Sequence, residues 1–190
     1  MNKSPPLVYR LIQDRGGVAA IEFALVAPIL IVMFLGCYEV TDYVRATMRT
    51  DQVAQSVAEL IARQASVTND TNMYGAGSIT DYCYAAQAVI APYNPANLTV
   101  KIASYTMSGG SAAEDWGVTC PANDTSTATT GFTPGVPPTG LLVANGDSVI
   151  IVTASYSWLA PDGGLFLHST RTATETAYAR PRSNATIPLS

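Results

Sequence analysis

Glu22 is the residue of this sequence whose type and setting most clearly predict chemistry. It lies in an apolar run in which only Glu22 and Glu39 carry charge between Val18 and Val40. A carboxylate inside a bilayer costs roughly 3 kcal/mol on insertion scales, so one that is retained there is a functional candidate. In the alternative interpretation Glu22 lies one turn into a helix, reaches the lipid headgroups and has no further role.

The run that contains Glu22 is long enough to cross a membrane. Val18 to Val40 comprise 23 residues. They form about 35 Å of helix, and the hydrocarbon core of a bilayer is about 30 Å thick. A core helix of a soluble protein is rarely this long and this apolar on every side. The run therefore predicts a transmembrane helix over residues 18–40.

The flank before the run is basic. Residues 1–17 contain three basic side chains and one acidic side chain. This bias predicts a cytoplasmic N-terminus and export of the chain after Val40. A secretory signal peptide is one alternative, but the run is too long and lacks a clear small-residue cleavage site. A lipoprotein box at Leu35-Gly36-Cys37 is another, but Phe34 stands where such boxes prefer leucine.

The residues that lead into the run carry a family resemblance. A glycine pair precedes the helix, the fifth residue after Gly17 is Glu22, and Phe23 follows it. This stretch resembles the processing site of type IV pilin-like proteins. More closely, it resembles the start of TadE/TadF-type pseudopilins, which are minor components of tight-adherence (Flp) pili. The residues that carry the resemblance are Arg15-Gly16-Gly17-Val18-Ala19-Ala20-Ile21-Glu22-Phe23-Ala24-Leu25-Val26-Ala27-Pro28.

The resemblance implies how the chain is processed. In that family a prepilin peptidase of the inner membrane cuts after the glycine that precedes the helix, which carries over to a cut between Gly17 and Val18. Glu22 would then be the fifth residue of the mature chain and, with Phe23, an assembly residue. The chemistry agrees, because Gly17 has no Cβ to clash in a protease site. The new α-amino group would also lie one helical turn from the Glu22 carboxylate, where each charge offsets the desolvation of the other.

Pro28 is the expected weak point of the membrane helix. Proline removes one backbone hydrogen bond and clashes with the preceding turn, which membrane helices tolerate when neighbours satisfy the freed carbonyl. The interpretation is either a passive kink or a flexible point that lets the helix leave the bilayer and repack in a filament.

The composition limits what the rest of the chain does. With 190 residues and one span, there is room for a single extracytoplasmic domain. Only 13% of the residues are charged and the net charge is −4, which argues against a nucleic-acid partner. The expected organisation is a leader over 1–17, the span over 18–40, an amphipathic helical extension over 41–66 and an α+β domain over 67–190.

The helical extension over 41–66 changes its apolar side along its length. The pairs Asp42 with Arg45 and Glu59 with Arg63 are spaced for ion pairs on its surface. Either its first half faces sister subunits or the membrane edge while its second half holds the domain, or the whole length makes one core contact. The two apolar sides are Val40, Val44 and Met48 on one hand, and Val53, Val57, Leu60 and Ile61 on the other, with Ala54, Ala58, Ala62 and Ala65 between them.

The remaining pattern predicts a small antiparallel sheet with one additional helix. A capping box at Ser78 opens a helix that ends before Pro92. Strands are expected over 98–107, 114–120, 147–158 and 165–178, with a reversal over 108–111 and a Thr/Pro/Gly-rich loop over 121–140. The fold class is α+β and pilin-like: a long N-terminal transmembrane helix, continuing into an amphipathic helix, packed against this sheet.

Catalytic chemistry has little support in the sequence. The one histidine, His168, has no partner motif, and no Gly-x-Ser-x-Gly elbow, metal-ligand spacing or phosphate-binding loop occurs. We therefore expect no enzyme activity, no catalytic or metal site, no cofactor and no small-molecule substrate.

The cysteines predict one disulfide. Cys37 lies in the span and behaves as a small apolar residue. Cys83 and Cys120 are the two outside it, in an oxidising compartment if the orientation is right. Their pairing would close a loop of about 37 residues, worth around 3 to 4 kcal/mol in the chain-entropy model. The alternative is two unpaired buried thiols.

Taken with the resemblance, these features imply a minor pilin or pseudopilin in the bacterial inner membrane that takes part in assembly or priming of a Flp pilus. Prepilin peptidase, the major Flp pilin, other minor pilins and membrane lipid are the implied partners. The alternative is a single-pass envelope binding module that never enters a filament.

Overall fold

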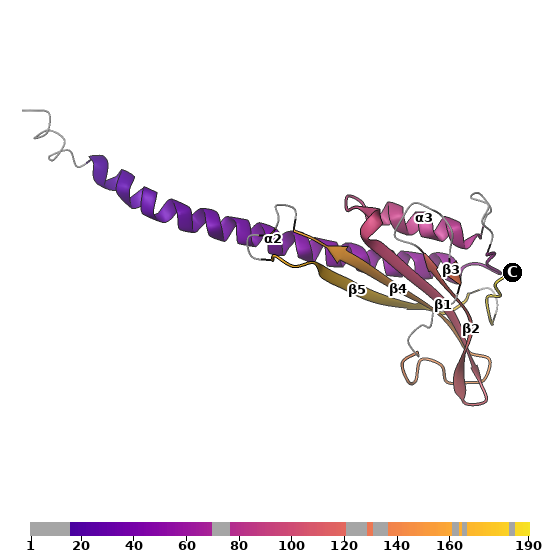
Figure 1. The fold of residues 1–190 in the computed structure, drawn as a ribbon. Helices are drawn as coiled ribbons and strands as arrows, with labels where there is room; N and C mark the ends of the chain where they lie inside the picture. Colours follow the sequence, from indigo (N-terminus) through magenta and orange to yellow (C-terminus); the bar gives the residue numbers. More distant parts are fainter. Residues whose placement is uncertain are drawn as a thin grey trace, which may run out of the picture.

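The computed structural model describes residues 16–69, 77–120, 129–130, 137–160, 164, 167–182 and 185–190. Its longest element is one helix, α2 (Gly16–Ala62), whose N-terminal half extends away from the remainder of the protein (Figure 1). The C-terminal half of α2 lies against the sheet. Most of the leader expected over 1–17 lies outside the described residues.

The end of α2 corrects the predicted boundary. The helix ends at Ala62 rather than near Ser66. The backbone N–H of Gln64 donates to the carbonyl of Ile61 at 2.9 Å, which closes the last turn. The chain then leaves the helix axis, because Val67 forms a parallel bridge with Leu189 near the C-terminus.

Five strands form one antiparallel sheet in the order β3-β2-β1-β4-β5. The hairpin between the first two strands turns on Gly109 and Gly110, whose φ angles of 60° and 84° suit glycine. The strands are β1 (Leu98–Ser108), β2 (Ser111–Cys120), β3 (Thr129–Thr130), β4 (Ser148–Trp158) and β5 (Arg171–Ala179).

The expected strands all occur; β4 starts one residue later than predicted, and the starts of β2 and β5 differ more. β2 begins at Ser111 rather than Glu114, because the turn is only two residues long and pairing resumes at once opposite Ser108. β5 begins at Arg171 rather than Leu165, opposite Trp158 where β4 ends. The expected loop over 121–140 includes the short strand β3, which pairs with β2; residues 121–128 and 131–136 of that loop lie outside the described residues.

Both long helices cover the same face of the sheet (Figure 1). α3 (Ile79–Val89) is followed by the short 3-10 helix η1 (Pro95–Asn97) and leads into β1. Alternate residues of the strands, such as Ile102 and Val152, are fully buried beneath the helices. Together these elements form an α+β fold with one long N-terminal helix, as predicted.

The opposite face of the sheet is mostly polar. Hydroxyl pairs cross from β4 to β5 at 3.1 Å, Thr153 with Thr176 and Ser155 with Thr174. At the end of the sheet farther from the extended half of α2, a second apolar cluster forms around Tyr105. The sheet therefore needs helices on one face only, which is typical of antiparallel sheets.

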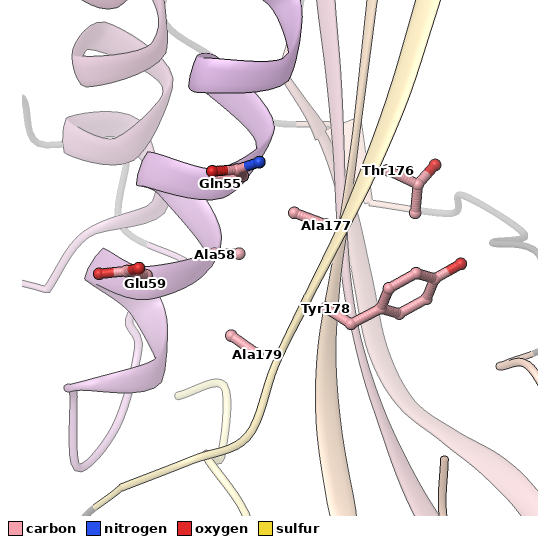
Figure 2. A pocket seen from close by; sticks show the side chains of 7 residues that line it. All are labelled: Gln55, Ala58, Glu59, Thr176, Ala177, Tyr178 and Ala179. Carbon is pink, nitrogen blue, oxygen red and sulfur yellow. The ribbon is translucent and has the colours of Figure 1, made fainter. Parts of the chain in front are cut away.

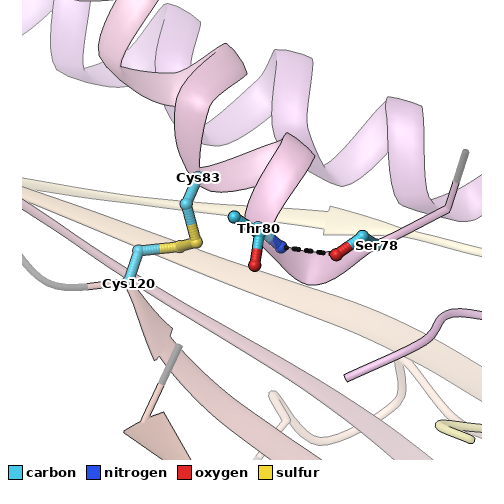
Figure 3. The surroundings of a disulfide bond; sticks show 4 residues. All are labelled: Ser78, Thr80, Cys83 and Cys120. Carbon is cyan, nitrogen blue, oxygen red and sulfur yellow. Dashed lines mark hydrogen bonds between the residues drawn. A yellow bond between two sulfur atoms is a disulfide. The ribbon is translucent and has the colours of Figure 1, made fainter. Parts of the chain in front are cut away.

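α3 is capped at its N-terminus and is joined to the sheet by a covalent bond (Figure 3). The Ser78 hydroxyl accepts a hydrogen bond from the N–H of Thr80, which confirms the predicted helix start at Ser78. The bond goes to the second helical residue rather than to Asp81, the third, as a capping box would have it. Cys83 of α3 is bonded to Cys120 at the end of β2, 37 residues away, with a Cα–Cα distance of 5.6 Å. The predicted disulfide is confirmed, and Cys37 is free and exposed.

Removing the disulfide should destabilise the domain. The double variant Cys83→Ser/Cys120→Ser should lose about 3 to 4 kcal/mol of unfolding free energy, because the closed loop restricts the unfolded chain. The measurement is chemical denaturation of the detergent-solubilised protein, followed by tryptophan fluorescence. Cys37→Ser is the matched control and should change stability by less than about 0.5 kcal/mol. Equal thiol labelling of Cys83 and Cys120 before and after reduction would contradict the pairing.

Candidate functional site

The predicted processing residues lie in the first turn of α2. Gly17 is helical, and a Cβ added there would meet no other heavy atom within 4 Å. The fold itself therefore does not require glycine at this position. A side chain at Gly17 would affect a protease that binds this backbone without disturbing the folded domain.

The helix that follows presents its side chains outward. Val18 is 55% exposed and Phe23 is 70% exposed, and Glu22 is exposed as well. None of the most apolar 18-residue window of the helix is buried, and by length and composition the helix could span a membrane. Among the residues that the structure describes, none outside α2 covers the Glu22 side chain.

α2 runs through Pro28 without interruption. Figure 1 shows the N-terminal half of the helix curving gradually, with no sharp bend along it. Gradual curvature is common in long helices. A functional hinge at Pro28 stays a prediction.

The apolar side of α2 changes where the domain begins, as one of the two sequence interpretations had it. Val40, Val44 and Met48 are 54%, 43% and 61% exposed. Val53, Val57 and Ile61 are fully buried beneath the domain, together with Ala54, Ala58 and Ala62. The sequence grouping was wrong for Leu60, which is 38% exposed, because the buried side of the helix passes through Val57 and Ile61 on either side of it.

Two carboxylates join α2 to the domain at the end of the apolar run, Glu39 within its last residues and Asp42 just after it. Glu39 is 4% exposed, and its Oε2 accepts a hydrogen bond from the backbone N–H of Leu167 at 3.0 Å. The Asp42 Oδ2 accepts from the Trp158 indole N–H at 2.8 Å, and its Oδ1 accepts from the Tyr93 hydroxyl at 3.0 Å. We call Glu39 and Asp42 the carboxylate clasp.

The clasp holds three separate parts of the domain at the end of the apolar run. Leu167 precedes β5, Trp158 ends β4, and Tyr93 lies between α3 and η1. An aromatic contact supports it, since Tyr43 packs edge-to-face on Trp158 with ring centroids 5.4 Å apart. Hydrogen bonds to charged acceptors are stronger than those between neutral groups, so the clasp fixes the domain on the helix.

Tyr93 responds electrostatically to the clasp. Burial of its phenol, together with the hydrogen bond to Asp42, raises the pKa of Tyr93 from 10.0 to about 12. The folded state thus favours the neutral phenol. By linkage, this stabilising contribution is present below a pH of about 10 and is lost as the pH rises through about 12.

One of the two predicted surface ion pairs forms. Arg63 donates to Glu59 at 3.3 Å on the exposed side of α2, where such a pair contributes little. The predicted pair between Asp42 and Arg45 is wrong. The Asp42 carboxylate is instead turned to the domain by Tyr93 and Trp158.

A groove of about 330 Å³ separates α2 from the edge strand β5 (Figure 2). Small side chains, Ala58, Ala177 and Ala179, point into the gap, while Glu59 points away from the strand. The lining also includes the Glu59 carboxylate and the hydroxyl side chains of Thr176 and Tyr178. Figure 2 shows Thr176 and Tyr178 on the side of β5 away from α2, so these groups do not converge with Glu59 on one point.

The other candidate groups named from the sequence are not brought together. His168 is exposed near the start of β5. Within the described ranges, no cluster of three His, Cys, Asp or Glu side chains could hold a metal ion. The clasp, by contrast, was missed, although two acids three residues apart at the end of an apolar run were a usable signal.

Weakening the clasp should loosen the domain from the helix. Asp42→Asn keeps the size of the side chain but removes the charge, and should lower the free energy of unfolding by about 1 to 3 kcal/mol. Denaturation followed by tryptophan fluorescence measures it, because Trp158 is a direct donor. The matched control is Asp51→Asn on the same helix, whose carboxylate is bonded only at the surface to Gln55. Equal stability of the two variants would show that Asp42 does not fix the domain.

The N-terminal helix matches a known protein family. Residues 17–59 match the family model described as TadE-like protein. The match begins at Gly17 and runs through the exposed half of α2, the clasp and most of the domain-facing half. The resemblance found in the N-terminal residues is confirmed by this match. No curated protein and no solved structure matches the chain.

Proposed function

Since its N-terminal helix is TadE-like, we propose that this protein is a minor pilin or pseudopilin of a tight-adherence (Flp) pilus. Residues 18–40 anchor it in the bacterial inner membrane, with the N-terminus in the cytoplasm and the α+β domain exported. Prepilin peptidase cuts it between Gly17 and Val18, and it then joins or primes the pilus. The observation that carries the proposal is the family match, which starts at the glycine of the proposed cut.

The shape of α2 supports an assembly role. The N-terminal half of the helix extends beyond the domain, so another chain can reach its whole circumference (Figure 1). Val40, Val44 and Met48 continue this uncovered apolar surface to the side of the domain. A helix presented in this way can pack laterally against the helices of other subunits once it leaves the bilayer.

The proposal is structural rather than enzymatic. The partners are prepilin peptidase, the major Flp pilin, other minor pilins and membrane lipid, with no nucleic acid and no small-molecule substrate. The competing proposal is an anchored binding module, in which Gly17 stays uncut and Glu22 reaches the headgroups without an assembly role.

The cut is the first test. Protein from its native membrane should begin at Val18, and Gly17→Leu should block processing, because a side chain would crowd the protease backbone site. N-terminal sequencing and intact mass measure both outcomes. Because a Cβ at Gly17 would meet nothing within 4 Å, Gly17→Leu should leave the folded domain intact, and a loss of processing would report on the peptidase alone. Protein that still begins at Met1 beside an active prepilin peptidase would exclude the pilin assignment.

Glu22→Gln separates assembly from anchoring. The amide should insert in the membrane at least as well as the carboxylate, because an uncharged side chain enters the bilayer at lower cost. Processing should persist if the peptidase recognises chiefly the glycine. Assembly should fail, because in a packed filament the carboxylate needs a partner, and the new amine of a neighbouring Val18 is the obvious one.

The measurement is a count of pili and of co-purified minor pilins after processing has been confirmed. Asp51→Asn, on the same helix but outside the span, is the control and should leave both unchanged. Parental piliation and partner recovery in the Glu22→Gln strain would favour the anchored binding module.

A further inference from the structure

Arg45 lies on the uncovered side of α2 close to the end of the span. It is exposed, and the residues the structure describes offer it no hydrogen bond or ion pair. It comes seven residues after Tyr38, the last residue before the clasp. This separation is about 10 Å along a helix.

The geometry of a helix brings the Arg45 side chain toward the bilayer. Side chains lean toward the N-terminus of their helix, and in α2 that direction leads to the span. The headgroup layer extends about 5 to 7 Å beyond the hydrocarbon on each side. The guanidinium therefore has to lie only about one helical turn nearer the bilayer than its own Cα to contact lipid phosphates. The long aliphatic part of the arginine side chain covers that distance.

Charge is separated across the helix at this level. The acids Glu39 and Asp42 are turned to the domain and accept hydrogen bonds there. The uncovered side carries Val40 and Val44, both about half exposed, with Arg45 beside them. An apolar surface continuous with the span and edged by a cation is complementary to an anionic bilayer surface.

We propose that Arg45 binds the phosphate group of an anionic phospholipid, with Val40 and Val44 resting at the boundary between headgroups and acyl chains. The planar guanidinium can donate two parallel hydrogen bonds to phosphate. The site orients the anchored protein so that the domain is held above the membrane on the opposite side of α2. It rests on the span crossing a bilayer and is independent of the pilus role.

Arg49 provides a matched control. It is also exposed, but it lies one turn farther from the span, and its guanidinium donates to the Gln52 side chain at 2.9 Å. That bond directs Arg49 toward the C-terminal end of the helix, away from the bilayer. The two arginines thus carry the same charge, but the guanidinium of Arg49 lies farther from the bilayer than that of Arg45.

The experiment measures which lipid surrounds residue 44. The full chain, with Cys37→Ala and Val44→Cys, is labelled with an NBD fluorophore without reduction and placed in phosphatidylcholine vesicles containing phosphatidylglycerol. Quenching is compared between trace phosphatidylglycerol and trace phosphatidylcholine, each with a nitroxide near the headgroup. Flotation of the vesicles confirms anchoring separately. A label at Val143→Cys, 76% exposed and just before β4, reports on the domain and should not be quenched.

At residue 44, we expect nitroxide-labelled phosphatidylglycerol to quench the NBD label about two- to fivefold more strongly than nitroxide-labelled phosphatidylcholine. This is the local enrichment of anionic lipid that one cation next to a membrane provides. Adding Arg45→Gln should bring the ratio close to one, and adding Arg49→Gln should leave it high. An unchanged ratio in Arg45→Gln, or an equal loss in both variants, would overturn the site. If neither lipid quenches the label at residue 44, the lipid site is wrong, and a second copy of the chain covers this surface instead. Failure of the protein to float would instead reject the span.

Discussion

The packing of the second half of α2 on the sheet is the contact on which the rest of the structure depends. Val53, Val57 and Ile61 are fully buried there, and burial of each such side chain stabilises a fold by roughly 1.5 to 3 kcal/mol. α3 adds to the same layer and is tied to β2 by the disulfide. One continuous helix forms both this core and the exposed apolar half, so the orientation of the domain is coupled to that of the helix residues that follow Pro28.

The clasp stands where these two environments meet. A buried carboxylate without partners would cost several kcal/mol, yet Glu39 is 4% exposed and accepts a backbone hydrogen bond. Asp42 likewise receives two side-chain donors. The acids therefore mark the first level at which α2 can be covered by protein. On the N-terminal side of the clasp, the side chains of α2 are mostly exposed.

Local patterns in the sequence predicted much of the architecture, for identifiable reasons. The long apolar run, the Ser78 cap, the glycine turn at 109–110 and the Cys83–Cys120 pair each depend on neighbouring residues or on a short set of possibilities. The clasp and the start of β5 depend on contacts across the fold. Asp42 is 116 residues from Trp158, its indole donor, and spacing on α2 alone favoured Arg45 as its partner. Processing and assembly at Gly17 and Glu22 involve other molecules, so neither sequence nor fold decides them.

The direction of α2 limits how two copies of the chain can pair through β5, the strand at one edge of the sheet. An edge strand invites pairing with a second copy, and the common symmetric arrangement places two such strands antiparallel about a two-fold axis. α2 runs alongside β4 and β5 (Figure 1), so that axis would also reverse one helix relative to the other. Two chains inserted in the same orientation in one bilayer have parallel helices, so they cannot be related by this two-fold axis. Membrane insertion in one orientation would thus by itself keep anchored copies from fusing their sheets symmetrically through β5.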